Sequence, residues 1–352
     1  MHNRGAGARI GVVSDQSVYT SEEQFAPFQA YRSELRSRQG LTFLPMHLSD
    51  VMWGPRWALA PFDVIFVKLG FRMARREATQ VLKDIRAATL GKKVIYFDGD
   101  DDLCIQWPEI LPFVDLYVKK HAFKDRTCYL QPYIGKSNLT DYVHRQFGFS
   151  FASDAITDES FPVPRDELSK IRVGWNLALD RKIVQLYRNT RHEEVAPRSN
   201  DIVCRAGVPN DWIRFLRGGV EPVLRRLDGR FRVLTPNQRV TPDVYLREMR
   251  DSKICVSPFG YGEICWRDFE AILCGCLLVK PDMSHVETHP DIFEEYRTYV
   301  PVRWDLSDLE EKCSYYLTHA EERNRMIAAA RSVLRDFYEN GGFASRFAEI
   351  LG

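Results

Sequence analysis

The first half of the chain alternates short apolar runs with longer amphipathic or polar segments. Runs of this kind predict strands at 9–14, 62–68, 93–97 and 115–118. The longer segments predict helices at 21–39 and 72–90, and Gly91 suits the end of the second. Strands separated by helices indicate βαβ units that build a mainly parallel sheet.

The same alternation returns after residue 200. Strands are predicted at 201–204, 232–234, 253–257 and 276–280. Helices are predicted at 211–227, with an interruption at Gly218-Gly219, and at 242–250, 263–274 and most of 307–350. Between 148 and 200 the pattern is lost among prolines, which is typical of a connection between domains.

These patterns predict an α/β protein of two Rossmann-like domains whose parallel sheets face a cleft. We expect an N-terminal domain at 1–180, a linker at 181–200 and a C-terminal domain at 201–335. A last helix at 336–352 has the length to cross back to the first domain.

Composition narrows the class of protein. Lys and Arg total 49 and Asp and Glu total 48, a balance that argues against binding nucleic acid through a broad basic field. No run approaches the ~20 apolar residues that span a bilayer, and the first ten residues lack the apolar core of a signal peptide. Eight cysteines without paired C-x-x-C spacing suggest buried thiols. We therefore expect a cytoplasmic protein.

The segment 257–281 carries the most specific chemistry. A strand is followed by Gly260 and Gly262 and then by a predicted helix, an arrangement that lets a phosphate approach backbone amides at the helix start. On that helix Glu263, Arg267 and Glu270 fall on one stripe, where carboxylates could hold a ribose and the guanidinium a diphosphate. The alternative is that Glu263 and Arg267 form an ordinary surface ion pair worth ~0.3–0.5 kcal/mol.

Residues 267–279, Arg-Asp-Phe-Glu-Ala-Ile-Leu-Cys-Gly-Cys-Leu-Leu-Val, resemble the donor-site segment of GT-B glycosyltransferases of the bacterial group 1 or exostosin-like type. The pattern is R-x-x-E-A-x-x-x-G-C-x-P-V, and residues 280–288 are also similar to bacterial members. The resemblance implies that Glu270 binds the donor ribose and that Arg267 serves the donor phosphates or supports Glu270. The donor-binding residues expected from the motif and its flanks are Arg205, Ser257, Gly260, Tyr261, Gly262, Glu263, Arg267 and Glu270.

Two positions depart from that pattern. Gly262 stands where retaining members have a second glutamate, and Leu278 replaces the usual proline. The first departure favours an inverting reaction, which needs a base for the acceptor hydroxyl. Asp15, after the first strand, is the candidate base, with a turn or helix-capping role as the alternative. Arg205, after the first strand of the second domain, is expected at the donor phosphates, or else is a surface cation.

Four further residues are candidates for the donor sugar or the acceptor. Asp98 and Asp100 follow a strand, and His285 and Glu287 follow a later one. With Asp102 the first two could form a metal site, but a polar loop with capping carboxylates is the simpler interpretation. His285 and His289 have zinc-like spacing, but Pro290 argues against a helix there and no third ligand is evident. We expect no metal and no cofactor.

The function predicted from these residues is metal-independent transfer of a sugar from a nucleotide sugar to a hydroxyl of a glycan, lipid-linked or other acceptor. The resemblance implies polysaccharide or cell-envelope synthesis, at the inner face of the membrane if the protein associates with it. The alternative is a noncatalytic protein that binds nucleotide sugars with the same fold. A sugar-nucleotide epimerase is less favoured because Gly5-Ala-Gly7 precedes the first strand and no early G-x-G-x-x-G follows it.

Overall fold

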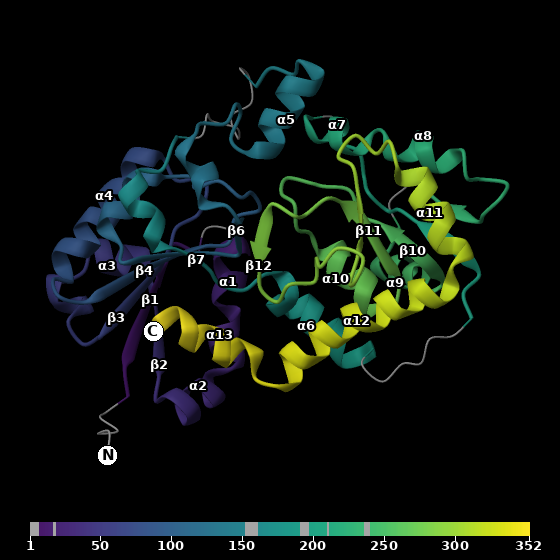
Figure 1. The fold of residues 1–352 in the computed structure, drawn as a ribbon. Helices are drawn as coiled ribbons and strands as arrows, with labels where there is room; N and C mark the ends of the chain where they lie inside the picture. Colours follow the sequence, from purple (N-terminus) through teal and green to yellow (C-terminus); the bar gives the residue numbers. More distant parts are fainter. Residues whose placement is uncertain (1–6, 17–18, 152–160, 191–196, 210, 236–239) are drawn as a thin grey trace.

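The computed structural model describes residues 7–16, 19–151, 161–190, 197–209, 211–235 and 240–352. Figure 1 shows two α/β domains side by side, the first in purple and blue and the second mainly in green. Both are built on parallel sheets, as the alternation of apolar runs and helices predicted.

The first domain has a six-stranded sheet in the order β2-β1-β3-β4-β5-β7, and all of its neighbouring strands are parallel. Its strands are β1 (Arg9–Ser14), β2 (Thr42–His47), β3 (Val64–Lys68), β4 (Lys93–Asp98), β5 (Leu116–Lys119) and β7 (Ile171–Val173). The four predicted strands are the central ones, which are apolar because helices cover both faces. The two unpredicted strands lie at the edges, where β2 tolerates Pro45 and β7 is only three residues long.

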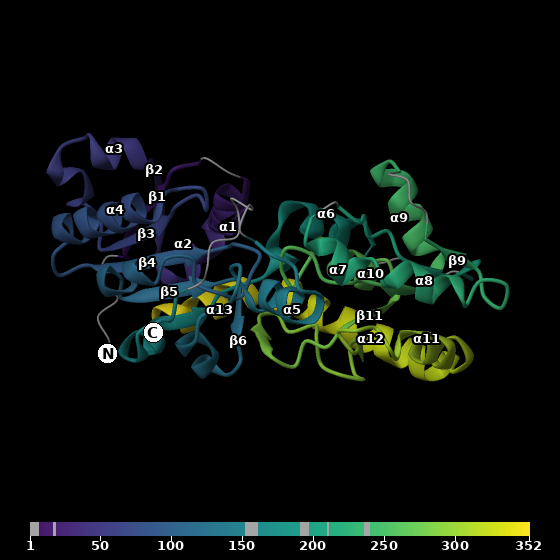
Figure 2. The same cartoon turned by 90° about the horizontal axis from the view of Figure 1, so that it is seen from above.

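Helices of the first domain flank this sheet on both faces (Figure 1), and Figure 2 shows the same domains from above. They are α1 (Tyr19–Ala30), α2 (Arg32–Gln39), α3 (Leu48–Met52) and α4 (Arg75–Ala88), whereas α5 (Asn138–Phe147) lies apart from the sheet and packs against residues 213–217 of the second domain. Short 3₁₀ helices lie at Arg56–Leu59, Pro108–Phe113, Arg126–Leu130, Arg165–Lys170 and Leu177–Leu179. Helix α4 buries Val81, Leu82 and Ile85, the face predicted from its spacing, and Gly91 after it has a left-handed φ of 77°.

The second domain has five parallel strands in the order β13-β11-β10-β8-β9. They are β8 (Asn200–Val203), β9 (Val233–Leu234), β10 (Ser252–Val256), β11 (Leu277–Pro281) and β13 (Val300–Val302). Counted within its own domain, each sheet places its first five strands in the order 2-1-3-4-5. The order therefore reverses between β1 and β3 in one domain and between β8 and β10 in the other, and ligands favour such crevices.

The helices of the second domain agree closely with the predicted segments. They are α7 (Ile213–Arg217), α8 (Val220–Arg225), α9 (Pro242–Arg250), α10 (Trp266–Leu273), α11 (Leu309–Thr318), α12 (Ala320–Glu339) and α13 (Gly342–Leu351). The interruption at Gly218-Gly219 separates α7 from α8, as expected. Helix α10, however, begins three residues later than predicted, and this changes the position of Glu263.

Among the contacts that hold the domains together are a pair of strands and a helix that crosses over. Strand β6 (His121–Phe123) of the first domain pairs antiparallel with β12 (Val286–Thr288) of the second. Helix α13 crosses back over the first domain (Figure 1), where the ring of Phe347 lies 5.1 Å from that of Phe28 and 5.8 Å from that of Phe66. The two domains are therefore joined by packed structure as well as by the chain between them.

Residues 181–190, expected within the linker, form helix α6 (Arg181–Thr190). The helix exists because Ile183, Leu186 and Tyr187 give it one buried face, and it lies against α10. Residues 191–196 of the expected linker lie outside the described residues.

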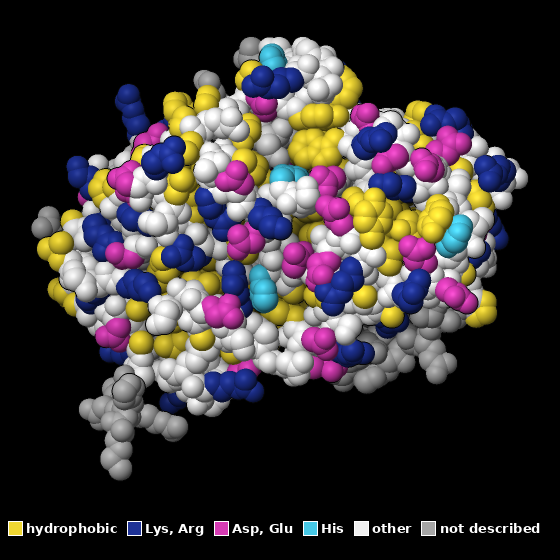
Figure 3. Space-filling view, in the orientation of Figure 1, with side chains coloured by type: hydrophobic (Ala, Val, Ile, Leu, Met, Phe, Trp, Pro, Cys, Tyr) yellow, Lys and Arg dark blue, Asp and Glu magenta, His cyan; other side chains and the backbone are white. Residues whose placement is uncertain are grey.

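Surface charge is mixed over the face seen in Figure 3, where basic and acidic side chains alternate without a single large patch of either sign. In the described ranges, no helix is both long and apolar enough to cross a membrane.

Candidate active site

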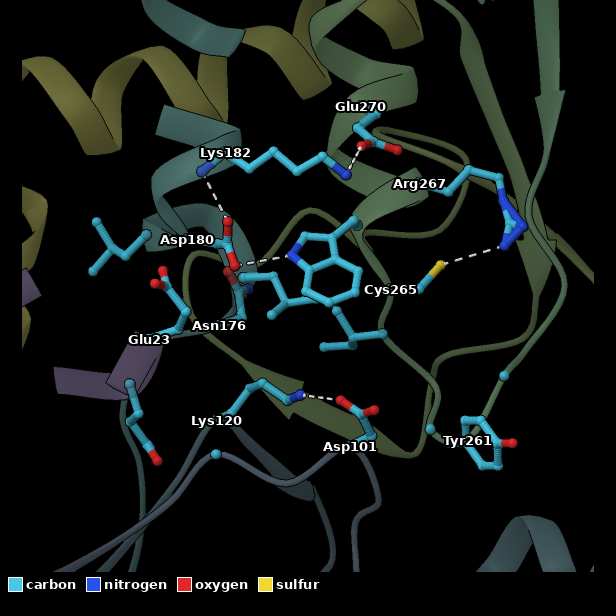
Figure 4. Close-up of a pocket in the computed structure, with 18 of the residues that line it drawn as sticks. Glu23, Asp101, Lys120, Asn176, Asp180, Lys182, Tyr261, Cys265, Arg267 and Glu270 are labelled. Atoms are coloured by element: carbon cyan, nitrogen blue, oxygen red, sulfur yellow. Dashed lines mark hydrogen bonds and ion pairs between the residues drawn. The ribbon is translucent and has the colours of Figure 1, made fainter. Parts of the chain in front are cut away.

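A cavity of about 590 Å³ lies between the domains, at the carboxyl edge of the second sheet where its strand order reverses (Figure 4). Six of the predicted donor residues line it: Arg205, Gly260, Tyr261, Gly262, Arg267 and Glu270. The first domain contributes Glu23, Asp101 and Lys120. A neighbouring cavity of about 870 Å³ shares Lys182, Arg205, Arg217 and Tyr245 with it, so the two lie side by side.

Helix α10 carries the central carboxylate of this cavity. Glu270 is 4% exposed, and its Oε2 accepts a hydrogen bond of 2.7 Å from the Tyr245 hydroxyl. Its Oε1 lies 3.2 Å from Nζ of Lys182 at the start of α6, as Figure 4 shows. Sequence reasoning missed Tyr245 and Lys182, because α9 and the expected linker showed no sign of facing the donor motif.

Two guanidiniums meet in the same cavity. Arg267 lies one helical turn before Glu270, and its buried Nε has no hydrogen-bond partner among the described residues. Arg217 of α7 donates 2.7 and 2.8 Å hydrogen bonds to the carbonyls of Phe259 and Gly207. Burial and the nearby Arg267 cation lower the pKa of Arg217. A buried and a half-buried cation on the wall of one cavity favour an anionic ligand.

Arg205 lines both cavities but carries its own counter-ion. It is 8% exposed in its side chain and pairs with Glu248, whose Oε2 accepts a 2.7 Å hydrogen bond from Nε. It is therefore neither an exposed surface cation nor an uncompensated charge. Sequence reasoning expected Arg205 here and missed Arg217, which comes from a helix with no motif of its own.

Glu263 does not lie on α10, which corrects the predicted stripe of Glu263, Arg267 and Glu270. The helix begins at Trp266 because Asp268 turns back to accept a 2.9 Å hydrogen bond from the backbone N–H of Cys265. Glu263 therefore belongs to the preceding loop and forms no i,i+4 pair with Arg267.

Glu263 is fully buried at the boundary between the domains. Its Oε1 accepts a 2.7 Å hydrogen bond from Asn138, and the imidazoles of His121 and His285 each lie 3.6 Å from its oxygens. Burial alone would raise the pKa of Glu263, but the two imidazoles hold it well below its usual range. Burial lowers the pKa of His121. Glu263, predicted at the donor, and His285, predicted at the donor sugar or the acceptor, thus lie in an interdomain contact.

Gly262 makes room for the first domain. A Cβ at this position would lie 1.6 Å from the carbonyl oxygen of Asp101, so the two backbones are in direct contact. At Gly260 a Cβ would meet only Nη2 of Arg217, the end of a flexible side chain, at 2.6 Å. We expected both glycines to admit a phosphate, but at Gly262 the close approach is that of Asp101.

Ser257 lies beneath the cavity and outside its lining. Its hydroxyl donates a 2.6 Å hydrogen bond to Asp268, which is in turn 3.1 Å from the buried Nζ of Lys280. Ser257 therefore supports the start of α10.

The remaining predicted residues are spread along the first domain and the domain boundary. Asp98 is buried against Lys119 at 2.6 Å, and the pKa of Asp98 is lowered by Lys119 and Lys68 although burial would raise it. Glu287 lies on β12 and pairs with Arg126 at 2.7 Å. Neither residue is among those that line the described cavities.

Asp15 lies where the strand order of the first sheet reverses. Its Oδ2 accepts a 2.7 Å hydrogen bond from the backbone N–H of Gly70, which ties the loop after β1 to the loop after β3. It is not among the residues that line the cavity between the domains, and its role as a base stays a prediction. In the described part of the chain, no group of three or more His, Cys, Asp or Glu side chains is placed to hold a metal ion.

Comparisons with known proteins bear on the family and the fold of this chain. Residues 214–350 match a family model described as glycosyl transferase-like. An α,α-trehalose-phosphate synthase (UDP-forming) from Burkholderia vietnamiensis has a similar structure, with 11% identity, coverage of 98% of this chain and 97% of that chain, and a TM-score of 0.50. A glycosyltransferase from Rickettsia africae ESF-5 has 11% identity, 98% and 99% coverage and a TM-score of 0.48. Comparison with curated protein sequences gives no significant match.

The family match includes the whole of α10 and the loop at 257–265 before it. It therefore covers the segment on which the resemblance was based. Together with the shared two-domain architecture, it confirms the predicted GT-B fold and the likeness to glycosyltransferases.

Proposed function

We propose that this protein transfers a sugar from a nucleotide-sugar donor to a hydroxyl group of an acceptor. The observation that carries the proposal is the pair formed by Arg267 and Glu270, one turn apart on α10, both on the wall of the interdomain cavity. A guanidinium suits a diphosphate, and a carboxylate suits the paired hydroxyls of a ribose. The glycosyl transferase-like match to residues 214–350 supports the same assignment.

In this proposal the donor diphosphate lies against Arg267 and Arg217. The buried Nε of Arg267 gains a partner, and the mutual repulsion of the two guanidiniums is relieved. Glu270 keeps its hydrogen bond from Tyr245 and exchanges Lys182 for ribose hydroxyls. Lys182, whose side chain is 62% exposed, has the freedom to leave Glu270 and face the diphosphate.

The reaction needs the charge of the departing nucleoside diphosphate to be neutralised. Arg217 and Arg267 supply fixed positive charge in a cavity partly shielded from water, so no metal ion is invoked. We further propose an inverting reaction, with Asp15 as the base expected from the sequence, and a cytoplasmic role in glycan or cell-envelope polysaccharide synthesis, as the resemblance implies.

Titration calorimetry with UDP, GDP and TDP tests the donor site. The preferred nucleotide should bind Glu270→Gln and Arg267→Ala about 10- to 150-fold more weakly, the equivalent of one charge-assisted hydrogen bond. Arg267→Lys should lose less nucleotide affinity than Arg267→Ala. The control Glu310→Gln removes a surface ion pair with Arg226 and should bind the nucleotide as the wild type does. Unchanged affinity in both Glu270→Gln and Arg267→Ala would contradict the site.

Donor turnover separates an enzyme from a noncatalytic binding protein. With the matching nucleotide sugar, the enzyme should release nucleoside diphosphate, slowly to water and faster to an acceptor, and EDTA should leave most of this activity intact. Donor binding without any release would favour the noncatalytic alternative. Loss of activity in EDTA that manganese restores would refute metal independence.

A further inference from the structure

One of the eight cysteines opens onto the interdomain cavity. Cys265 is half-buried and is among the residues that line this cavity. It is the N-cap residue of α10, so its side chain lies at the positive end of the helix. The proposed function gives this thiol no role.

The other seven cysteines lack this combination of access and surroundings. Six of them are buried: Cys104, Cys204, Cys255, Cys274, Cys276 and Cys313. Cys204 reaches the neighbouring cavity but is only 7% exposed, and burial raises its pKa. Cys128 is half-buried, but it does not line the interdomain cavity and burial raises its pKa. Cys265 is therefore the cysteine best placed to meet a molecule in that cavity.

A buried guanidinium stands beside the Cys265 thiol. Nη2 of Arg267 lies 3.9 Å from Sγ, and Figure 4 shows the sulfur directed toward it. Arg267 is 9% exposed, and its Nε has no hydrogen-bond partner among the described residues. A cation buried this deeply with an unpartnered N–H indicates that an anion completes the site.

The negative charges near this sulfur are already balanced. Asp268 lies 3.5 Å from Sγ, but it is also 3.1 Å from the buried ammonium of Lys280. Each of the four carboxylates that line the cavity has a partner on the protein: Glu23 with Arg181, Asp101 with Lys120, Asp180 with Trp266 and Glu270 with Lys182.

The cations on this wall are not balanced in the same way. Within the described ranges, neither Arg267 nor Arg217 forms an ion pair with a carboxylate, and Arg217 donates only to backbone carbonyls. An anionic molecule is therefore attracted to the part of the cavity where Cys265 lies.

We propose that Cys265 is a thiol modification site, at which a small disulfide that carries carboxylates forms a mixed disulfide and blocks the donor. The attached group extends from Cys265 into the space beside Arg267, which the donor diphosphate needs. The effect on donor binding rests on the proposed function, whereas the modification itself does not.

The step is a thiol–disulfide exchange. The S–H proton of Cys265 passes to water, and the thiolate attacks one sulfur of the small disulfide. A new S–S bond forms to Cys265 while the original S–S bond breaks, and its electron pair leaves with the released thiolate, which takes up a proton from water. Cys265 is oxidised and the released half is reduced, so no further oxidant is needed. Arg267 stabilises the negative charge on the attacking sulfur.

The test treats the 352-residue chain with glutathione disulfide, stops the reaction with iodoacetamide and locates the adducts by peptide mass spectrometry. Cys265 should be modified at least tenfold faster than Cys128. Whichever of UDP, GDP and TDP binds best should slow the reaction at Cys265 at least tenfold and leave the rate at Cys128 unchanged. Calorimetry on the modified protein should show at least a tenfold loss of nucleotide affinity, which dithiothreitol restores.

Cystamine, a disulfide with two ammonium groups, tests the charge argument. Its rate at Cys265 relative to that at Cys128 should be at least tenfold lower than the same ratio for glutathione disulfide, because Arg267 and Arg217 repel a cation.

Two variants locate the effect. Cys265→Ser keeps a side chain that can cap α10 and removes the thiol, so treatment with glutathione disulfide should leave the nucleotide affinity of this variant as it was before treatment. Cys128→Ser is the matched control at the other half-buried cysteine, and it should lose nucleotide affinity on treatment as the wild type does.

Each contrary result has a separate meaning. If the untreated protein binds nucleotide but Cys265 reacts no faster than Cys128, or if its adduct leaves nucleotide affinity unchanged, the modification site is refuted while the proposed function stands. Equal selectivity with cystamine would refute the attraction of an anion by Arg267 and Arg217. Selective modification of Cys265 in a protein that binds none of the nucleotides would contradict the proposed function and leave the modification site intact.

Discussion

Gly262→Ala tests whether contact between the loop at 257–265 and the first domain controls activity. The added methyl group would lie 1.6 Å from the carbonyl oxygen of Asp101 and 2.4 Å from its carbonyl carbon. Ordinary carbon contacts need about 3.5–4.0 Å, so the two backbones must separate by about 2 Å. Gly262 is not among the glycines with positive φ, so the perturbation is steric and does not strain its own backbone.

The size of the effect of Gly262→Ala on kcat/KM depends on how the structure can relieve this clash. Overpacking of this kind costs about 1–3 kcal/mol. Both atoms belong to backbone, so rotation of a side chain cannot relieve the clash, and the domains must open at this edge of the cleft. If transfer requires the closed contact, the same free energy is added to the barrier. We therefore expect kcat/KM to fall about 5- to 150-fold, with little loss of nucleotide affinity.

The assay compares kcat/KM for nucleotide release, nucleotide affinity by calorimetry and the radius of gyration by small-angle scattering. Gly207→Ala is the matched control, because a Cβ there meets nothing within 4 Å and Gly207 lies on the wall of the neighbouring cavity. Wild-type kcat/KM and an unchanged radius in Gly262→Ala would refute the reasoning.

Two further predictions concern stability. Burial lowers the pKa of His121, so on acidification the unfolded chain takes up a proton near pH 6.5 that the folded protein does not. The free energy of unfolding should therefore fall below that pH, by up to ~1.4 kcal/mol per pH unit. Chemical denaturation of His121→Gln between pH 7.5 and 5.5 should show a smaller fall, and an identical slope would contradict this account. Phe347→Ala should lower the free energy of unfolding by about 3–5 kcal/mol, because the ring is fully buried where α13 crosses onto the first domain. Trp57 is exposed, so Trp57→Ala should lower it by less than about 0.5 kcal/mol. Equal melting temperatures for these two variants would show that the crossing helix does not stabilise the fold.

Much of the fold could be predicted from the sequence because it depends on local pattern. The central strands β3 and β4 are continuous apolar runs, and α4 repeats its apolar residues with helical spacing, so both were predicted to within a few residues. Edge strands such as β2 and β7 were not, since a strand buried on fewer sides is less uniformly apolar. The likeness to glycosyltransferases was also readable, because Arg267 and Glu270 lie in one short continuous motif.

The functions of individual side chains near that motif depended on tertiary structure. Glu263 looked like a donor ligand, but Asn138, 125 residues earlier, hydrogen-bonds to it at the domain boundary. Gly262 was predicted at a phosphate and lines the cavity, but the sequence did not show that its missing side chain also admits the backbone of Asp101. Hydrophobic periodicity reports which face of an element is buried and says nothing of which distant element covers it. The partners of these residues were decided only when the two domains packed together.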